Sequence, residues 1–264
     1  MGAADISYIG MGFALGAVLI SLAVYRITRV GLEKELLLSV GRMTVQLSLV
    51  GAYITLLFEL NHPAVNIGYV LLMVAVANYS VLRNAGLVFG MFFYTFPAIL
   101  IAVLAVIAYF FLLIYKPAPL YDAPYLIPIA GMLLGNSMNR TIVTMERFYT
   151  TVNRNADRFA SLTAMGASLR EAAQPFIREA YRAGLSPALA NMATMGIAFL
   201  PGMMTGQILG GSPPIVAVKY QITIVVAIYV ATDLASVLCI SLSMRRGFDR
   251  FGFLRPDIFK ARPK

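Results

Sequence analysis

Residues 84–115 read NAGLVFGMFFYTFPAILIAVLAVIAYFFLLIY, a run of 32 residues without a charged side chain. A helix needs roughly 20 mostly apolar residues to cross about 30 Å of hydrocarbon, so this run is long enough to span a membrane. Its core is 89–115, with Pro97 as an expected kink. The segment KPAP at 116–119 predicts an abrupt end, because proline lacks the amide donor and clashes with the preceding turn.

The composition of the whole chain agrees with this segment. Of 264 residues, 59% are hydrophobic and 12% are charged, and the mean hydropathy is +0.78. Soluble domains usually hold about 45–50% apolar and about 25% charged residues, so the chain is neither an ordinary globular enzyme nor a disordered protein. The net charge is nonetheless +9. A basic and hydrophobic chain predicts a multi-pass protein of a bacterial-type inner membrane.

Rare residue types exclude several kinds of site. The single cysteine, Cys239, and the single histidine, His62, leave no disulfide framework and no zinc or haem ligand set. No lysine follows a glycine, as a phosphate-binding loop would require. The sequence therefore predicts no enzyme activity, no resident metal and no cofactor in this chain.

Six further spans are expected beside the one quoted above. In chain order, all seven are 6–25, 43–60, 64–82, 89–115, 125–139, 187–209 and 215–244. The fifth runs on through Arg140 toward Met145, and the sixth is broken or kinked at Pro201-Gly202. We therefore predict an all-α membrane protein with about seven transmembrane helices, forming one transmembrane permease domain over residues 1–264.

The basic residues predict the orientation. With the N-terminus outside and the C-terminus inside, 19 of the 21 lysines and arginines fall on the inner side. Only Lys116 and Lys219 fall outside. This asymmetry follows the positive-inside rule, so the positive charge indicates topology and contact with membrane lipid, and no nucleic acid partner is expected.

The longest polar loop is expected to lie inside and to hold short coupling-type helices, in a coupling region at 146–184. Ser168 and Glu171 have the spacing of a capping box, which predicts a helix over 169–183 that ends at Gly184. A short amphipathic helix precedes it at 156–165. The docking surface for a partner ATPase is predicted at Arg158, Phe159, Leu162, Met165, Gly166, Ser168 and Glu171. The alternative is a pair of solvated helices whose arginines contact anionic lipid headgroups. A cytoplasmic basic tail is expected at 245–264.

Five sequence blocks resemble a known family. They are GRMTVQL at 41–47, GNSMNR at 135–140, AMGAS at 164–168, LPGMMTGQI at 200–208 and YQI at 220–222. In this order they are similar to the FetB (YbbM) family of small permeases. The resemblance implies iron export with a separate ATPase subunit, which would bind ATP and Mg²⁺. Plant relatives in that family are half-size permeases associated with aluminium tolerance.

The broken sixth span is the predicted substrate path. A break in a membrane helix frees backbone groups, which are tolerated only where they face protein or a watery cavity. The residues assigned to the path here are Pro201, Gly202, Met203, Met204, Thr205 and Gln207. The alternative is a proline kink relaxed by neighbouring helices, with methionines as adaptable packing residues.

Two carboxylates within spans complete the candidate path. Asp233 lies deep in the seventh span, where a carboxylate is costly to insert, and Glu59 lies near the outer end of the second. Asp233 either belongs to a cation path or makes a structural hydrogen bond to another helix, and interfacial water suffices to explain Glu59. Asn78, Asn136, Asn139 and Gln46 are expected to form interhelical hydrogen bonds.

Together these features predict the permease subunit of an ATP-binding-cassette transporter, paired as a homodimer in which each copy docks one ATPase. A metal ion, with iron moving outward, is the substrate that the family resemblance implies. One alternative is an ATP-independent channel or secondary carrier that uses Asp233 and Glu59. Another is a membrane scaffold that recruits a soluble partner.

Overall fold

The computed structural model describes residues 6–249 and 251–260 and is built of helices, which confirms the all-α prediction. The helices are α1 (Tyr8–Gly16), α2 (Val18–Thr28), α3 (Glu33–Leu60), α4 (Pro63–Asn84), α5 (Phe92–Phe110), α6 (Ala123–Arg154), α7 (Ala156–Ala164), α8 (Leu169–Thr194), α9 (Gly202–Leu209) and α10 (Pro214–Gly247). Short helical turns η1 (Phe89–Met91), η2 (Phe111–Tyr115) and η3 (Pro256–Ile258) complete them.

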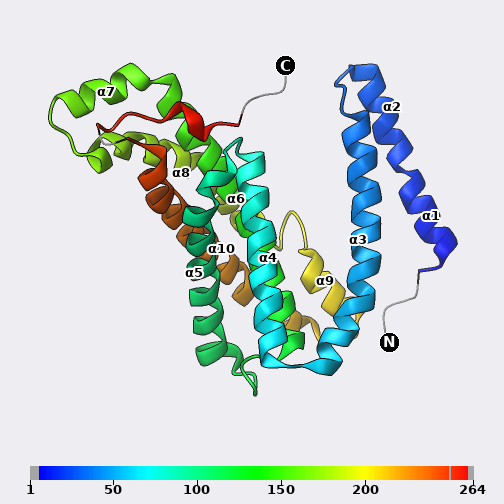
Figure 1. Ribbon diagram of the computed structural model, residues 1–264. Coiled ribbons are helices and arrows are strands. Elements are labelled where there is room, and N and C mark those ends of the chain that lie inside the picture. Colours follow the sequence, from blue (N-terminus) through cyan, green and yellow to red (C-terminus); the bar gives the residue numbers. More distant parts are fainter. Residues whose placement is uncertain (1–5, 250, 261–264) are drawn as a thin grey trace.

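The long helices run back and forth between two ends of the molecule (Figure 1). The passes are α1–α2, α3, α4, α5–η2, α6, α8–α9 and α10. Five of these seven are long and apolar enough to cross a membrane; α6 and the α8–α9 pair are not among them. The membrane fold is thus confirmed, and the exact number of spans and their orientation remain predictions.

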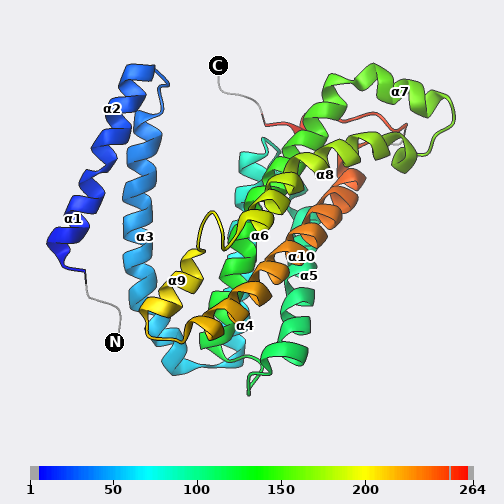
Figure 2. The same cartoon turned by 180° about the vertical axis from the view of Figure 1, so that it is seen from behind.

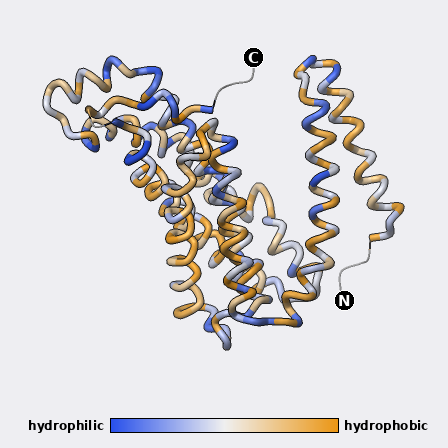
Figure 3. The backbone as a smooth tube through the Cα atoms, in the orientation of Figure 1, coloured by the Kyte–Doolittle hydropathy of each residue, from blue (hydrophilic) through white to orange (hydrophobic). Residues whose placement is uncertain are grey.

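The polar segments gather at one end of the molecule. The α2–α3 turn, α7 and the segment after α10 lie at the same end, and hydrophilic residues concentrate there (Figure 3). The α3–α4 turn and the loop between η2 and α6 lie at the opposite end. This is the arrangement that the basic residues predict, although Arg250, Arg262 and Lys264 lie outside the described residues.

Several helices extend beyond the spans predicted for them. The helix α3 begins at Glu33, ten residues before the predicted start at Met43, and α6 continues past Met145 to Arg154. Charged residues end the apolar span without ending the helix, because an exposed helix tolerates them well. The first residues of the predicted coupling region are therefore the last turns of α6.

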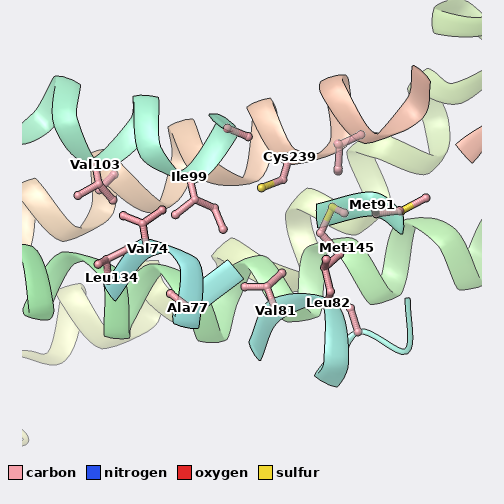
Figure 4. Close-up of a cluster of buried hydrophobic side chains, with 14 of the residues drawn as sticks. Val74, Ala77, Val81, Leu82, Met91, Ile99, Val103, Leu134, Met145 and Cys239 are labelled. Atoms are coloured by element: carbon pink, nitrogen blue, oxygen red, sulfur yellow. The ribbon is translucent and has the colours of Figure 1, made fainter. Parts of the chain in front are cut away.

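The main core lies between α4, α5, α6 and α10 (Figure 4). Val74 and Val81 of α4, Val103 of α5 and Cys239 of α10 are all fully buried there. The helix α6 is central, since it packs against α4, α8 and α10. A helix enclosed by protein can carry more polar residues than one that faces lipid, which accounts for the lower hydropathy of α6.

Hydroxyl pairs join α6 to α10 inside this core. Thr232 donates to Ser137 Oγ at 3.3 Å, the Thr141 and Ser236 hydroxyls lie 3.4 Å apart, and Tyr149 donates to Ser243 Oγ at 2.7 Å. The sequence separation is 95, 95 and 94 residues, so the two helices run parallel in fixed register. Such bonds between membrane helices are typically worth about 0.6 kcal/mol each.

The predicted end of a helix at Gly184 is wrong. The helix α8 continues through Gly184 and Pro187 to Thr194. Gly184 is buried against α6, where a Cβ atom would overlap Oγ1 of Thr144. Glycine is required at this position for the close approach of two helices, and the chain does not adopt the left-handed conformation that the prediction assumed.

The segment after α10 folds back over the end of the bundle where α4 and α5 connect. The Val88 amide donates to the Ile258 carbonyl at 2.9 Å, and the Lys260 amide donates to the Gly86 carbonyl at 2.8 Å. The Ile258 side chain is fully buried. Within the described part of the predicted basic tail, residues 258–260 are therefore attached to the bundle.

Candidate substrate path and coupling surface

The sixth pass is broken in the middle, as the Pro201-Gly202 pair predicts. The helix α8 ends at Thr194, residues 195–201 form a short loop, and α9 begins at Gly202 (Figure 2). Gly196 adopts a positive φ of +85° in this loop, and its amide donates to the Phe199 carbonyl at 2.9 Å. The backbone thus leaves helical geometry at the place where the sixth span was expected to break.

A cavity of about 320 Å³ adjoins this break. Its walls come from α6, α8, α9 and α10, with Met132, Asn136 and Arg140 spaced one turn apart along α6. The other lining residues are Ala188, Asn191, Met192, Met195, Pro201, Gly202, Met203, Gln221, Ile224, Val225, Ile228 and Tyr229. We call this space the break cavity.

A second cavity of about 450 Å³ shares Met132, Met203 and Ile224 with the break cavity. Its lining is rich in aromatic rings, including Tyr115 and Tyr220, whose ring centroids lie 5.4 Å apart. The other lining residues are Pro124, Tyr125, Pro128, Ile129, Gln207, Ser212 and Val216. We call it the tyrosine cavity.

Unpartnered polar atoms mark both cavities. Oε1 of Gln221 in the break cavity has no hydrogen-bond partner, and neither do Oε1 of Gln207 and the hydroxyl of Tyr115 in the tyrosine cavity. All three atoms are buried. A buried polar atom without a partner costs about 1–3 kcal/mol, so a ligand or water that bound to these atoms would recover that cost.

The structure brings part of the predicted path together. Pro201 and Gly202 line the break cavity, Gln207 lines the tyrosine cavity, and Met203 lines both. Met204 and Thr205 also lie in α9, but they line neither cavity, and the Thr205 hydroxyl donates to the Pro201 carbonyl at 3.1 Å.

The two predicted carboxylates lie elsewhere. Asp233 is half-buried on α10, where the Tyr181 hydroxyl donates to its backbone carbonyl at 3.4 Å. Glu59 is exposed near the end of α3. Neither side chain lines the break cavity or the tyrosine cavity.

Sequence reasoning missed the polar residues that α6 and α10 contribute. Arg140 was placed at the inner membrane boundary, and Asn136 was expected to bond to another helix. The Asn136 amide instead donates to Met132 O in its own helix at 2.8 Å, whereas Asn78 donates to Phe92 O at the start of α5. The spacing of Met132, Asn136 and Arg140 at every fourth residue was the available indication that they share one face.

The predicted docking residues divide into a buried and an exposed set. Phe159 is 2% exposed and lies against Phe176 and Phe248, with ring centroids at 5.7 and 5.2 Å. Leu162 packs against the same cluster. Met165 is 77% exposed, and Arg158 is also exposed, with its guanidinium 6.0 Å from the Phe176 ring. Phe159 and Leu162 thus hold α7 in place, and Arg158 and Met165 face outward.

The turn from α7 to α8 has the predicted capping geometry. Gly166 adopts a positive φ of +93° after α7. The Ser168 amide donates to Glu171 Oε2 at 2.8 Å, and the Glu171 amide donates to Ser168 Oγ at 3.4 Å. The hydrogen bonds from Ser168 hold the pKa of the Glu171 carboxyl below its usual value. The start of α8 is thereby fixed to the end of α7.

Comparison with known proteins adds the family. Residues 8–248 match the model of the uncharacterised protein family UPF0014. The chain belongs to this family. The match covers the break, both cavities and α7, and it confirms the resemblance drawn from the five sequence blocks.

Related proteins occur in bacteria and plants. The UPF0014 membrane protein YjkA of Bacillus subtilis is 32% identical over 90% of this chain and 92% of its own. The protein ALUMINUM SENSITIVE 3 of Arabidopsis thaliana is 31% identical over 94% of this chain and 90% of its own. The "Probable iron export permease protein FetB" of Escherichia coli is 26% identical over 94% of this chain and 95% of its own. No solved structure matches the chain. The chain is a multi-pass membrane permease of this family.

Proposed function

We propose that the chain is the permease subunit of an ATP-binding-cassette transporter that exports a metal ion such as iron. ATP and Mg²⁺ would bind to a separate ATPase subunit. The observation that carries this proposal is the broken α8–α9 pass, because its break lines a cavity whose walls come from α6, α8, α9 and α10. Broken helices often form substrate sites in transporters. The name of the Escherichia coli relative supports iron as the metal and export as the direction of transport.

The helix α8 offers a direct connection between partner and cavity. It begins at the capping box beside α7 and ends 26 residues later, where Ala188, Asn191 and Met192 line the break cavity. Close packing of Gly184 on Thr144 keeps its middle against α6. A push on α7 would therefore reach the cavity through one continuous helix, and ATP-driven closure would use this route for alternating access.

The proposal includes a homodimer. The helices α1, α2 and α3 have no buried residue, although each is strongly apolar. Gly12 and Gly16 of α1 have no atom of another residue near the position of a Cβ, so a second helix could approach them closely. Two copies, each with one ATPase, would enclose a larger pathway than one chain of 264 residues.

A channel or carrier driven by a cation gradient receives less support. It would need Asp233 or Glu59 on the path, and neither lines either cavity. A scaffold without transport would not explain why the buried Oε1 atoms of Gln207 and Gln221 lack hydrogen-bond partners.

The test is to reconstitute this chain in vesicles together with an ATP-binding-cassette ATPase from the same organism. We expect the two proteins to co-purify, and we expect ATP hydrolysis in vesicles to rise with a transported metal within a panel of metals. A double variant should abolish the complex. Arg158→Glu reverses the charge on the exposed face of α7, and Met165→Ser removes the exposed apolar side chain that follows this helix. Lys116→Glu, the same charge change on an exposed residue at the other end, is the control. A complex that survives the α7 variant would contradict docking at α7.

A further inference from the structure

The charge of the two cavities is unusual for a path that carries a metal cation. Arg140 is the one charged side chain that lines either of them, and no aspartate or glutamate does. Among residues 6–249 and 251–260, Arg140 forms no salt bridge, and no group of three His, Cys, Asp or Glu is placed to hold a metal. The break cavity is therefore positive, and its neutral thioethers cannot offset that charge.

The two helix ends at the break differ in what they offer a ligand. At the end of α8, the Thr194 hydroxyl donates to the Ala190 and Asn191 carbonyls, and the Ala198 amide donates to the Thr194 carbonyl. These hydrogen bonds partly satisfy the acceptors that α8 would otherwise present to the cavity. Two of the last four carbonyls of α8, those of Asn191 and Thr194, are thus satisfied within the loop.

The start of α9 is not capped. Its N-cap is Pro201, and no side chain accepts a hydrogen bond from the first turn. The first intrahelical bond recorded there runs from the Thr205 amide to the Pro201 carbonyl. The amides of Gly202 and Met203, two residues that line the break cavity, therefore carry no helical bond. Free amides at the positive end of a helix attract anions.

Gln221 supplies an independent indication of a ligand. The residue is 7% exposed, it lines the break cavity, and its Oε1 atom has no partner. An amide group can turn either its oxygen or its NH₂ toward a ligand. With the guanidinium of Arg140 on α6 and the free amides of α9, it completes a set dominated by donors on three different helices.

We propose that the break cavity is an anion site, so that the metal crosses as an anionic complex with a carboxylate-bearing ligand and not as a bare cation. The anion site stands on the cavity alone, and the metal in the complex rests on the proposed function. An arginine guanidinium recognises planar carboxylates through paired hydrogen bonds. The methionines Met132, Met192, Met195 and Met203 would pack against the apolar parts of a bulky complex.

The test measures binding to the purified permease alone, by titration calorimetry in detergent. The probes are the ferric citrate complex, citrate alone, inorganic phosphate and manganese(II) chloride without chelator. We expect ferric citrate to bind and manganese(II) to fail. Arg140→Gln should weaken ferric citrate binding by about 10- to 100-fold, and Arg140→Lys should restore most of it. Arg154→Gln, an exposed arginine of the same helix outside the cavity, should bind like the wild type.

Each outcome decides a separate point. Citrate or phosphate binding as tightly as ferric citrate, with the same dependence on Arg140, would support the anion site and contradict the metal complex. Manganese(II) binding that survives Arg140→Gln would overturn the anion site, as would the absence of binding by every anion. If Arg140→Gln does not fold, Gln221→Leu replaces it, with an expected loss of about tenfold. Intact anion binding without ATP-driven export would count against the proposed function only.

Discussion

The N-terminal helices α1–α3 and the bundle helices α4, α5 and α10 are all apolar enough to cross a membrane, but they pack very differently. In α1–α2 and α3, none of the most apolar 18-residue window is buried, whereas α4, α5–η2 and α10 bury 39–44% of theirs. The views from front and back both show α1–α3 standing apart from the bundle along most of their length (Figures 1 and 2). Apolar composition therefore predicts that a helix enters the membrane but not what it contacts there.

The two regions meet mainly at one end. The Asn61 side chain donates to Asp122 Oδ1 at 2.8 Å and accepts from the Ala123 amide at 2.9 Å, which ties the α3–α4 turn to the start of α6. The hydroxyls of Tyr53 on α3 and Tyr69 on α4 also hydrogen-bond. The polar side chains Arg42 and Gln46 lie further along α3 with Arg83 of α4 beside them. Arg42 and Arg83 lie just outside the predicted spans 43–60 and 64–82, so this polar groove lies at the end of the molecule where the basic residues gather.

The largest effect is expected from a methyl group added to a glycine in the bundle. Gly184→Ala places a Cβ onto Oγ1 of Thr144 and 3.1 Å from the Arg140 carbonyl, so α8 must move away from α6. We expect a loss of about 2–3 kcal/mol in the free energy of unfolding, measured as a lower thermal midpoint in detergent.

The matched variant in the N-terminal helices α1–α3, which we call the hairpin, is Gly51→Ala on α3, where no atom lies within 4 Å of the new Cβ. It should be neutral or stabilising by up to about 1 kcal/mol, because alanine favours the helix. Equal losses at both positions would contradict the contrast between the regions. A loss confined to the dimeric form of Gly51→Ala would show that a second copy packs on α3.

The contrast also explains how far the sequence predicts this molecule. Uncharged runs and the positions of arginines and lysines predicted the passes, because burial of apolar surface dominates at that scale. The role of Gly184 could not be predicted, since a helix end and a close helix contact both favour glycine. Arg140 and Gln221 could be recognised as lining residues only in three dimensions, because the sequence predicts the break at Pro201-Gly202 but not that α6 and α10 meet α9 there. Asp233, the most conspicuous intramembrane acid, lies outside both cavities.

A smaller effect is expected from a buried hydroxyl. Tyr149 is fully buried, and its hydroxyl donates to Ser243 Oγ at 2.7 Å between α6 and α10. Tyr149→Phe should lower the free energy of unfolding by about 1 kcal/mol. Tyr53→Phe removes a partly exposed hydroxyl bond between α3 and α4 and should cost less than half as much, while amide exchange in α3 becomes faster. Similar thermal shifts for both variants would show that the hairpin is held as firmly as the bundle.

The smallest expected effect concerns the ion pairs that hold the chain after α10. Asp257 accepts from Arg255 and Arg246, each at 3.0 Å, and these hydrogen bonds hold the pKa of its carboxyl below the usual value. Because the pKa of Asp257 is lower in the folded protein, its ion pairs stabilise the folded segment fully at pH values above the unfolded pKa of about 3.9. It is lost as the pH falls through the lower, folded pKa.

Hydrogen exchange at the Val88 and Lys260 amides reports this effect, since both amides bond between this segment and the start of the α4–α5 connection. Relative to intrinsic exchange, protection in the wild type should fall as the pH drops below about 4. Asp257→Asn should show the weaker protection at every pH. The control is Glu33→Gln at the start of α3, a carboxylate that forms no salt bridge within the described chain. Unchanged protection in Asp257→Asn would mean that burial of Ile258 holds the segment by apolar packing alone. Burial of apolar side chains would then account for this contact of the bundle, whereas α1–α3 bury none of theirs.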